Sequence, residues 1–195
     1  MRALTFPIRL EFKVSTLSND FTAYDDEGNI IAYVRQKLFK WKDEIQVFAD
    51  ESRREVIYRI KADRWLDFSA SYSFTDGYGD YLGRIARHGM KSIWRASYQI
   101  MDHHDLPLYT LQEENPWVKL MDGLFGEIPL AGNYVFNPTY LFTDVNGDLT
   151  ARLRKEPSLF GRRFTVYDKV PISPDHGEII MLGLMMMVLL ERKRG

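Results

Sequence analysis

The residues of this sequence that most suggest chemistry are His103, His104 and Asp105, because His and Asp are residue types that ligate metal ions. His88 or His176 would have to supply a distant third ligand. Adjacent residues on a strand face opposite sides, so His103 and His104 cannot easily share one ion. We therefore predict a solvated turn here and no metal site.

Two other stretches resemble ligand-binding loops at first sight. Asp144–Asp148 begins like a calcium loop, but the last position of such a loop needs a bidentate Glu, and Lys155 stands there. The glycines at 77, 79 and 83 are one residue off the dinucleotide-binding fingerprint, and we expect a strand rather than a helix after them. Both stretches therefore predict turns.

No catalytic constellation is visible. The sequence has no HExxH motif, no P-loop and no serine in a nucleophile elbow. It has no cysteine, which excludes disulfides, thiolate zinc sites and cysteine nucleophiles. The formal net charge of −1 gives no reason to expect nucleic acid as a partner. We expect neither an enzyme nor a cofactor.

The element that must position everything else is Ile179–Leu190, twelve residues without a polar side chain. As a helix it is about 18 Å long, against about 30 Å of bilayer hydrocarbon, so it is too short for a transmembrane segment. It is apolar on every side, which indicates burial on every side. The run Met185–Met187 suits such a position because flexible thioether side chains fill irregular gaps. We predict a helix enclosed by the rest of the chain.

The rest of the chain predicts a wall of short strands. With 195 residues, 45% of them hydrophobic, the chain can bury a sizeable core. Short strands at even spacing are typical of an antiparallel sandwich or barrel. We predict twelve strands, at Ile8–Lys13, Phe21–Tyr24, Ile30–Arg35, Glu44–Phe48, Arg54–Ile60, Phe68–Phe74, Tyr81–Ala86, Trp94–Met101, Leu106–Leu111, Tyr140–Thr143, Leu149–Leu153 and Phe164–Tyr167.

A repeat supports this count. Asp-x-x-Gly starts at Asp25, Asp76 and Asp144, and an Ala or Gly follows seven residues after each Asp, at 32, 83 and 151. The first and third copies continue into a second strand without a gap, and the middle copy does so with two extra residues. In such turns Asp bonds its own backbone and Gly supplies a positive φ. We interpret the three copies as an internal duplication.

Units of this kind followed by one apolar helix resemble the tubby C-terminal-like fold, and within it the LURP-one-related and phospholipid-scramblase group. The units at Asp25 and Asp76 and the helix Ile179–Leu190 carry the resemblance. It implies a mainly β fold, a closed antiparallel barrel of about twelve strands that encloses the hydrophobic C-terminal helix. Tubby proteins bind phosphoinositides, and scramblases are associated with membranes and calcium. No tubby lipid-pocket motif occurs here, and the cysteine cluster lipidated in scramblases has no counterpart.

The resemblance covers nearly the whole chain, so we interpret 1–195 as a single tubby C-terminal-like domain. An insert at about 115–138 has no counterpart in the family, and Asn115-Pro116 at its beginning resembles a helix start. The N-terminus lacks the unbroken apolar core of a signal peptide, so we expect a cytoplasmic protein, peripheral at a membrane surface.

Charge is expected to separate between the two ends of such a barrel. The third, seventh and eleventh strands run the same way, so the connections after them open at one end, where we also expect a turn at Lys61–Arg64. The basic rim at that end consists of Lys37, Lys40, Lys42, Arg87, Lys91, Arg154, Lys155, Arg162, Arg163, Arg192, Lys193 and Arg194. The opposite end receives Asp25, Asp26, Glu27, Asp50, Glu51, Asp76, Asp80, Asp102, Asp105, Asp144, Asp148 and Asp168.

A dipolar body of this kind can steer an anionic partner to one rim. Our first hypothesis is therefore a non-enzymatic binding module that engages anionic lipid headgroups or phosphorylated ligands through the basic rim. The alternative is a protein-interaction or structural scaffold acting through 117–137, where Trp117, Leu120, Leu124 and Phe125 recur at helical spacing. An enzyme with a pocket in the barrel mouth ranks last, because a packed helix should leave little interior volume.

Overall fold

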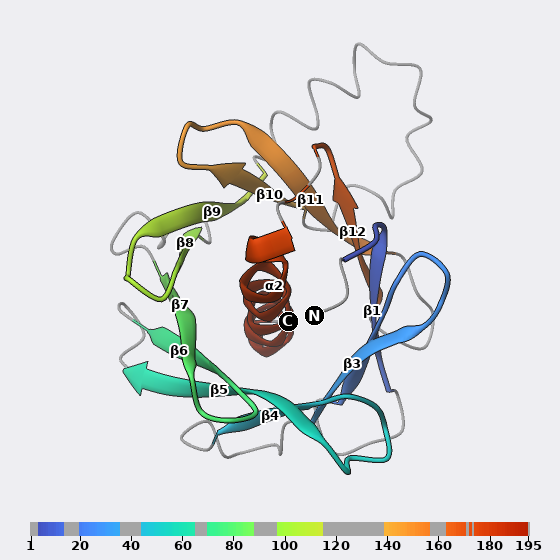
Figure 1. The fold of residues 1–195 in the computed structure, drawn as a ribbon. Helices are drawn as coiled ribbons and strands as arrows, with labels where there is room; N and C mark the ends of the chain where they lie inside the picture. Colours follow the sequence, from blue (N-terminus) through green and yellow to red (C-terminus); the bar gives the residue numbers. More distant parts are fainter. Residues whose placement is uncertain are drawn as a thin grey trace.

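The computed structural model describes residues 4–13, 20–35, 44–64, 70–87, 97–114, 139–156, 163–170, 172 and 174–194, with the backbone alone at 64, 174, 175 and 191–194. Twelve strands pair with their neighbours, and β1 pairs with β12 to close the barrel. Figure 1 looks along the barrel, with the helix α2 in its centre. The elements are β1 (Ile8–Phe12), β2 (Phe21–Tyr24), β3 (Ile30–Arg35), β4 (Ile45–Phe48), β5 (Val56–Arg64), β6 (Ser71–Asp76), β7 (Tyr81–Arg87), β8 (Ser97–Met101), β9 (Pro107–Glu113), β10 (Thr139–Asp144), β11 (Leu149–Glu156), β12 (Arg163–Asp168) and α2 (Pro174–Arg194).

All neighbouring strands are antiparallel, so successive connections alternate between the two ends of the barrel. The end that holds the turns 25–29, 50–53, 77–80, 102–106 and 145–148 is called the turn end. The other end, to which the chain runs after β1, β3, β5, β7, β9 and β11, is called the rim end. Because β12 finishes at the turn end, α2 enters the barrel there and points its last residues to the rim end.

The core lies between the inner face of the wall and α2. Alternate residues of each strand point inward, as Ile8, Leu10 and Phe12 do in β1. Every residue of Ile179–Leu189 is buried, and Met185–Met187 have no exposed surface. Complete burial explains why the helix has no polar face, and it confirms the predicted enclosed helix and the core role of its methionines. No helix in the described part of the chain is long and apolar enough to cross a membrane.

The predicted Asp-x-x-Gly turns are confirmed at Asp25, Asp76 and Asp144. In the turn between β6 and β7 the Asp76 Oδ1 accepts hydrogen bonds from the backbone N–H of Tyr78, Gly79 and Asp80 at 2.8–2.9 Å. The glycine four positions into each unit has a positive φ, +87° at Gly28, +100° at Gly79 and +87° at Gly147. The ladder shifts register beside each of these turns, so each hairpin combines a tight turn with a bulge.

The structure adds two units of the same geometry that the glycine pattern missed. Asp50 Oδ1 accepts the N–H of Ser52 at 2.7 Å, and Asp102 Oδ1 accepts the N–H of His104 at 2.8 Å. The position of the glycine is taken by Arg53 with φ 59° and by Asp105 with φ 62°. The recurring Asp was the available signal, because the carboxylate that closes the turn is present in all five.

Close approaches between α2 and the wall occur at two glycines. A Cβ on Gly83 of β7 would clash with Ile179 Cδ1 and with the carbonyl oxygen of Met101. A Cβ on Gly183 of α2 would clash with Ile100 Cδ1 of β8. The hydroxyl of Tyr109 in β9 also lies 3.1 Å from Nδ1 of His176 near the start of α2. These three contacts hold the helix against β7, β8 and β9.

Several sequence expectations need correction. Lys61–Arg64 is the last part of β5 and not a turn, because its backbone continues the ladder with β6 as far as Arg64 and Ser71. The structure describes neither the insert at 115–138 with its Asn115-Pro116 start nor residues 68–69 and 94–96 of two predicted strands, so those predictions lie outside the described residues.

Candidate functional site

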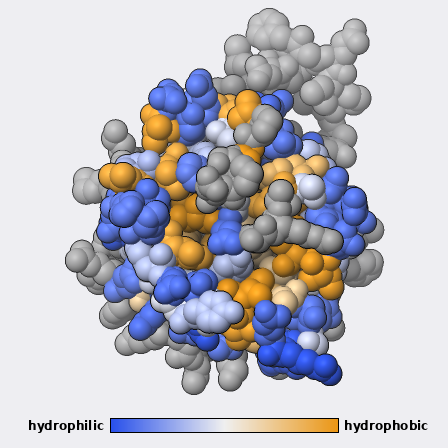
Figure 2. Space-filling view, viewed as in Figure 1, coloured by the Kyte–Doolittle hydropathy of each residue, from blue (hydrophilic) through white to orange (hydrophobic). Residues whose placement is uncertain are grey.

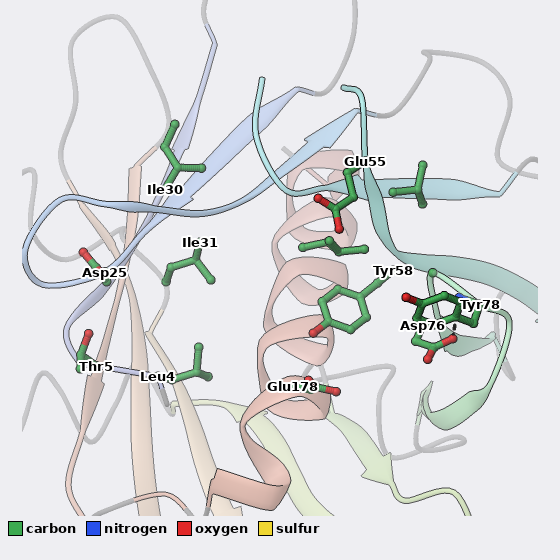
Figure 3. A pocket seen from close by; sticks show the side chains of 13 residues that line it. Leu4, Thr5, Asp25, Ile30, Ile31, Glu55, Tyr58, Asp76, Tyr78 and Glu178 are labelled. Carbon is green, nitrogen blue, oxygen red and sulfur yellow. Dashed lines mark hydrogen bonds between the residues drawn. The ribbon is translucent and has the colours of Figure 1, made fainter. Parts of the chain in front are cut away.

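A cavity of about 580 Å³ opens at the turn end, on the side of the barrel where β3 and β5 begin (Figure 3). It is a recess in the barrel mouth, bordered by turns and by the first turns of α2. The helix rests against β7, β8 and β9, and the free space lies across the barrel from that contact. The described residues that line the cavity are Leu4, Thr5, Asp25, Ile30, Ile31, Glu55, Val56, Ile57, Tyr58, Asp76, Gly77, Tyr78 and Glu178.

Two hairpins fix one wall of this cavity. The turn between β6 and β7 lies so close to β5 that a Cβ on Gly77 would come within 2.6 Å of the Val56 carbonyl oxygen. The guanidinium of Arg59 donates to the carbonyl oxygens of Gly77 at 2.8 Å and of Asp76 at 3.3 Å. The hydrogen bonds and the close backbone contact hold the turn against the start of β5.

The polar lining of the cavity is acidic. It contains the carboxylates of Asp25, Glu55, Asp76 and Glu178, and no Lys, Arg or His belongs to the described lining. Asp25 and Asp76 also close their own turns, through the N–H of Asn29 at 2.7 Å and of Gly79 at 2.8 Å. Hydrogen bonds from Asn29 lower the pKa of Asp25, so this carboxylate is ionised at neutral pH. Glu55 and Glu178 are the acids left to face an occupant.

Tyr58 and Glu178 form the deeper polar pair. Burial raises the pKa of Tyr58, and the charge of Glu178 and the hydrogen bond to its carboxylate raise it further. Figure 3 shows the Tyr58 ring extending between β5 and the first turns of α2, with Glu178 beside its hydroxyl. The hydroxyl donates to the carboxylate, which leaves the second carboxylate oxygen able to accept another donor.

Two other acids of the turn end are paired with bases. Glu51 accepts from Lys13 Nζ at 2.6 Å and from the Thr22 hydroxyl at 3.2 Å. Asp105 lies 3.0 Å from Arg84 Nε. The predicted acidic end therefore contains carboxylates in ion pairs on the outer wall and carboxylates facing the cavity, besides those that only close their own turns, as Asp102 and Asp144 do.

His103 and His104 lie in the exposed turn after β8, as predicted, with ring centroids 3.9 Å apart. The strand argument used against a shared ion was wrong, because in a turn the two rings can come together. Within the described residues no group of three His, Cys, Asp or Glu side chains could hold a metal ion.

The structure describes four side chains of the predicted basic rim. Arg154 and Lys155 lie near the end of β11, and Arg163 begins the paired β12, so their backbones are close together, whereas the side chains of Arg154 and Lys155 point to opposite faces of the wall. Arg163 Nε also lies 2.9 Å from Glu11. Arg87 ends β7, four strands away around the barrel. Lys37, Lys40, Lys42, Lys91 and Arg162 lie outside the described residues, and of Arg192, Lys193 and Arg194 only the helical backbone is described.

The fold defines a class of protein, a closed twelve-stranded antiparallel barrel filled by its own C-terminal helix. The LURP-one-related family matches residues 30–175, and the chain belongs to that family. It is also similar to the X-ray structure of a protein from Arabidopsis thaliana, with a TM-score of 0.53, 12% sequence identity and coverage of 99% of this chain and 94% of the other. At that identity the likeness shows the fold alone. No curated protein matches the chain.

Proposed function

We propose that the protein is a non-enzymatic binding module whose rim end engages phosphate-bearing anions, either lipid headgroups or soluble phosphorylated ligands. The observation that supports this most directly is the alternation of the strands. It directs the connections after β3, β7 and β11, which carry most of the basic rim, to the end opposite the turns that begin with Asp. A barrel with one basic and one acidic end orients itself toward an anionic partner.

The described part of the rim supports a cluster on the hairpin of β11 and β12. Arg154 and Arg163 are exposed, and Lys155 lies on the same strand as Arg154. Two acids lie among these cations: Glu11 is ion-paired with Arg163, and Glu156 is opposite Arg163 in the ladder of β11 and β12. Further cations must come from the neighbouring connections and the end of α2, and each Lys or Arg near an anionic membrane contributes about 1 kcal/mol.

Vesicle sedimentation tests the proposal. We expect binding to vesicles that contain phosphatidylserine or a phosphoinositide, weaker binding at higher salt and none to neutral vesicles. Arg162→Glu with Arg163→Glu should weaken binding at least about 30-fold, since two cations contribute about 2 kcal/mol. Arg152→Glu with Lys169→Glu is the matched control, because it makes the same change of charge at residues outside the predicted basic rim.

A second arm separates the two sources of phosphate. Titration with a soluble inositol phosphate, followed by calorimetry, should give binding if a free phosphorylated ligand suffices. Binding to vesicles without binding to the soluble headgroup would assign the site to a membrane surface. Absence of both at low salt, or equal loss in the control variant, would refute the proposal.

A further inference from the structure

We propose that the cavity at the turn end binds a small organic cation, an apolar body that carries one ammonium or guanidinium group. This site is separate from the basic rim, because it lies at the opposite end of the barrel. Nothing in the proposed function requires it, so the two proposals stand or fall separately.

The size and shape of the cavity indicate a small molecule as the occupant. Its volume of about 580 Å³ lies within the range of roughly 300–1,000 Å³ that is usual for small-molecule sites. Its lining includes the start of β5, the hydrogen-bonded turn at 76–80 and the first turns of α2. A recess between a helix and hairpin turns can enclose a compact ligand, whereas a protein partner would need a broader flat surface.

The apolar walls of the cavity favour a ligand with an apolar body. Leu4, Ile31, Val56 and Ile57 line the cavity without being fully buried, so water meets apolar surface there. Ile30, 42% exposed, lies at its opening. Figure 2 shows hydrophobic patches interspersed with hydrophilic ones on this face of the molecule. An occupant with an apolar body removes this surface from water, which favours binding.

The charge of the lining selects a cation. The four carboxylates of the lining would repel an anion, and the described lining contains no basic side chain that could bind one. The start of α2 contributes a positive partial charge of only about half a unit, which is too small to reverse the sign. Glu178 is the deepest acid, oriented by the Tyr58 hydroxyl, and Glu55 lies nearer the opening. The ring of Tyr78, which is 97% exposed, offers a further face to a cation at the opening.

Three probes of one shape test the proposal: 4-phenylbutylammonium, 4-phenylbutan-1-ol and 4-phenylbutanoate, titrated into the full chain at low salt and followed by NMR shifts. We expect the ammonium to bind, the alcohol to bind at least about tenfold more weakly, and the carboxylate not to bind. The binding of the ammonium should weaken as salt is added.

Variants locate the effect. Glu55→Gln and Glu178→Gln should each weaken ammonium binding about tenfold while leaving alcohol binding unchanged, whereas Glu113→Gln, at the rim end of β9, should change neither. If Glu178→Gln does not fold, the exposed Glu55 decides the question. Equal affinity for ammonium and alcohol, the same loss in Glu113→Gln, or no binding at millimolar ammonium would overturn the proposal. Loss of vesicle binding alone would not affect it, because that is a property of the other end.

Discussion

Replacing Gly83 by alanine should destabilise the protein, and more strongly than the same replacement at Gly79. Gly83 has a φ of +144°, which side-chain-bearing residues rarely adopt. Its added Cβ would also clash with Ile179 Cδ1 and with the Met101 carbonyl oxygen. The side chain of Ile179 can shift, but the carbonyl belongs to the backbone of β8, which is paired with both β7 and β9, so relief requires movement of the wall itself.

The size of the effect follows from two contributions. Positive φ in a residue other than glycine costs about 1–2 kcal/mol. Overpacking against the helix and the wall costs about 1–3 kcal/mol. The sum is about 2–5 kcal/mol of unfolding free energy, which for a chain of 195 residues lowers the Tm by about 5–15 °C. Gly79→Ala isolates the first contribution, because Gly79 has a φ of +100° and nothing within 4 Å of an added Cβ.

Urea unfolding followed by far-UV circular dichroism measures both variants. We expect Gly79→Ala to lose about 1–2 kcal/mol and Gly83→Ala to lose clearly more. Ile179→Val removes the clashing Cδ1, so in the Gly83→Ala background it should cost less than in the wild type, a positive coupling in a double-mutant cycle. Equal losses at Gly79 and Gly83, or no coupling with Ile179, would refute the close packing of α2 on β7.

Three further predictions concern the core and the turns. Met186→Ala should cost about 2–5 kcal/mol in urea unfolding, because the side chain is fully buried and leaves a cavity. Tyr33→Phe should cost about 1–3 kcal/mol, because it removes the buried 2.8 Å hydrogen bond to Asp20, whose other oxygen has no partner among the described residues. Burial and the hydrogen bond to Asp20 raise the pKa of Tyr33 to about 12. The contribution of the Tyr33 hydroxyl to stability is therefore complete below pH 10 and is lost by about pH 12. Absorbance at 295 nm should show this tyrosine ionising later than the others. Backbone hydrogen bonds from Leu106 and His104 lower the pKa of Asp102 below its ordinary 3.8. The Asp102 carboxylate therefore stabilises the fold above that pH, and this stabilisation is lost as the pH falls further. The urea midpoint should drop with acid, and it should drop less steeply in Asp102→Asn.

Most of the wall and all of the buried helix could be read from the sequence, because both rest on local patterns. Ile179–Leu190 has no polar residue, and only complete enclosure accounts for that in a helix too short for a bilayer. Each unit has a small residue, Ala or Gly, seven positions after its Asp. At Gly83 the reason is that the helix leaves no room for a side chain. The turns that contain Arg53 and Asp105 could not be assigned to the repeat from the Asp-x-x-Gly pattern, because that pattern has glycine where the backbone requires only a positive φ.

The cavity could not be predicted in the same way. Its existence depends on how far α2 lies from the barrel axis, and that is decided by contacts at Gly83, Gly183 and His176 between segments distant in the sequence. Its lining comes from five separate places in the chain, and the Asp-x-x-Gly units at two of them predict a turn and not a cavity. The separation of paired from unpaired acids also depends on tertiary contacts such as that between Glu51 and Lys13.

The pairing of β1 with β12 joins Ile8 to Val166, and the helix that fills the interior follows β12 in the chain. During synthesis the hairpins can form one by one as they leave the ribosome, but their inner apolar faces meet no core until α2 has emerged. Until then the nascent chain exposes the apolar inner face of an incomplete sheet, so its need for chaperones should be greatest just before α2 emerges. A stop codon shortly before Gly177 would leave a polypeptide that has every strand of the barrel but lacks the helix on which the strands pack.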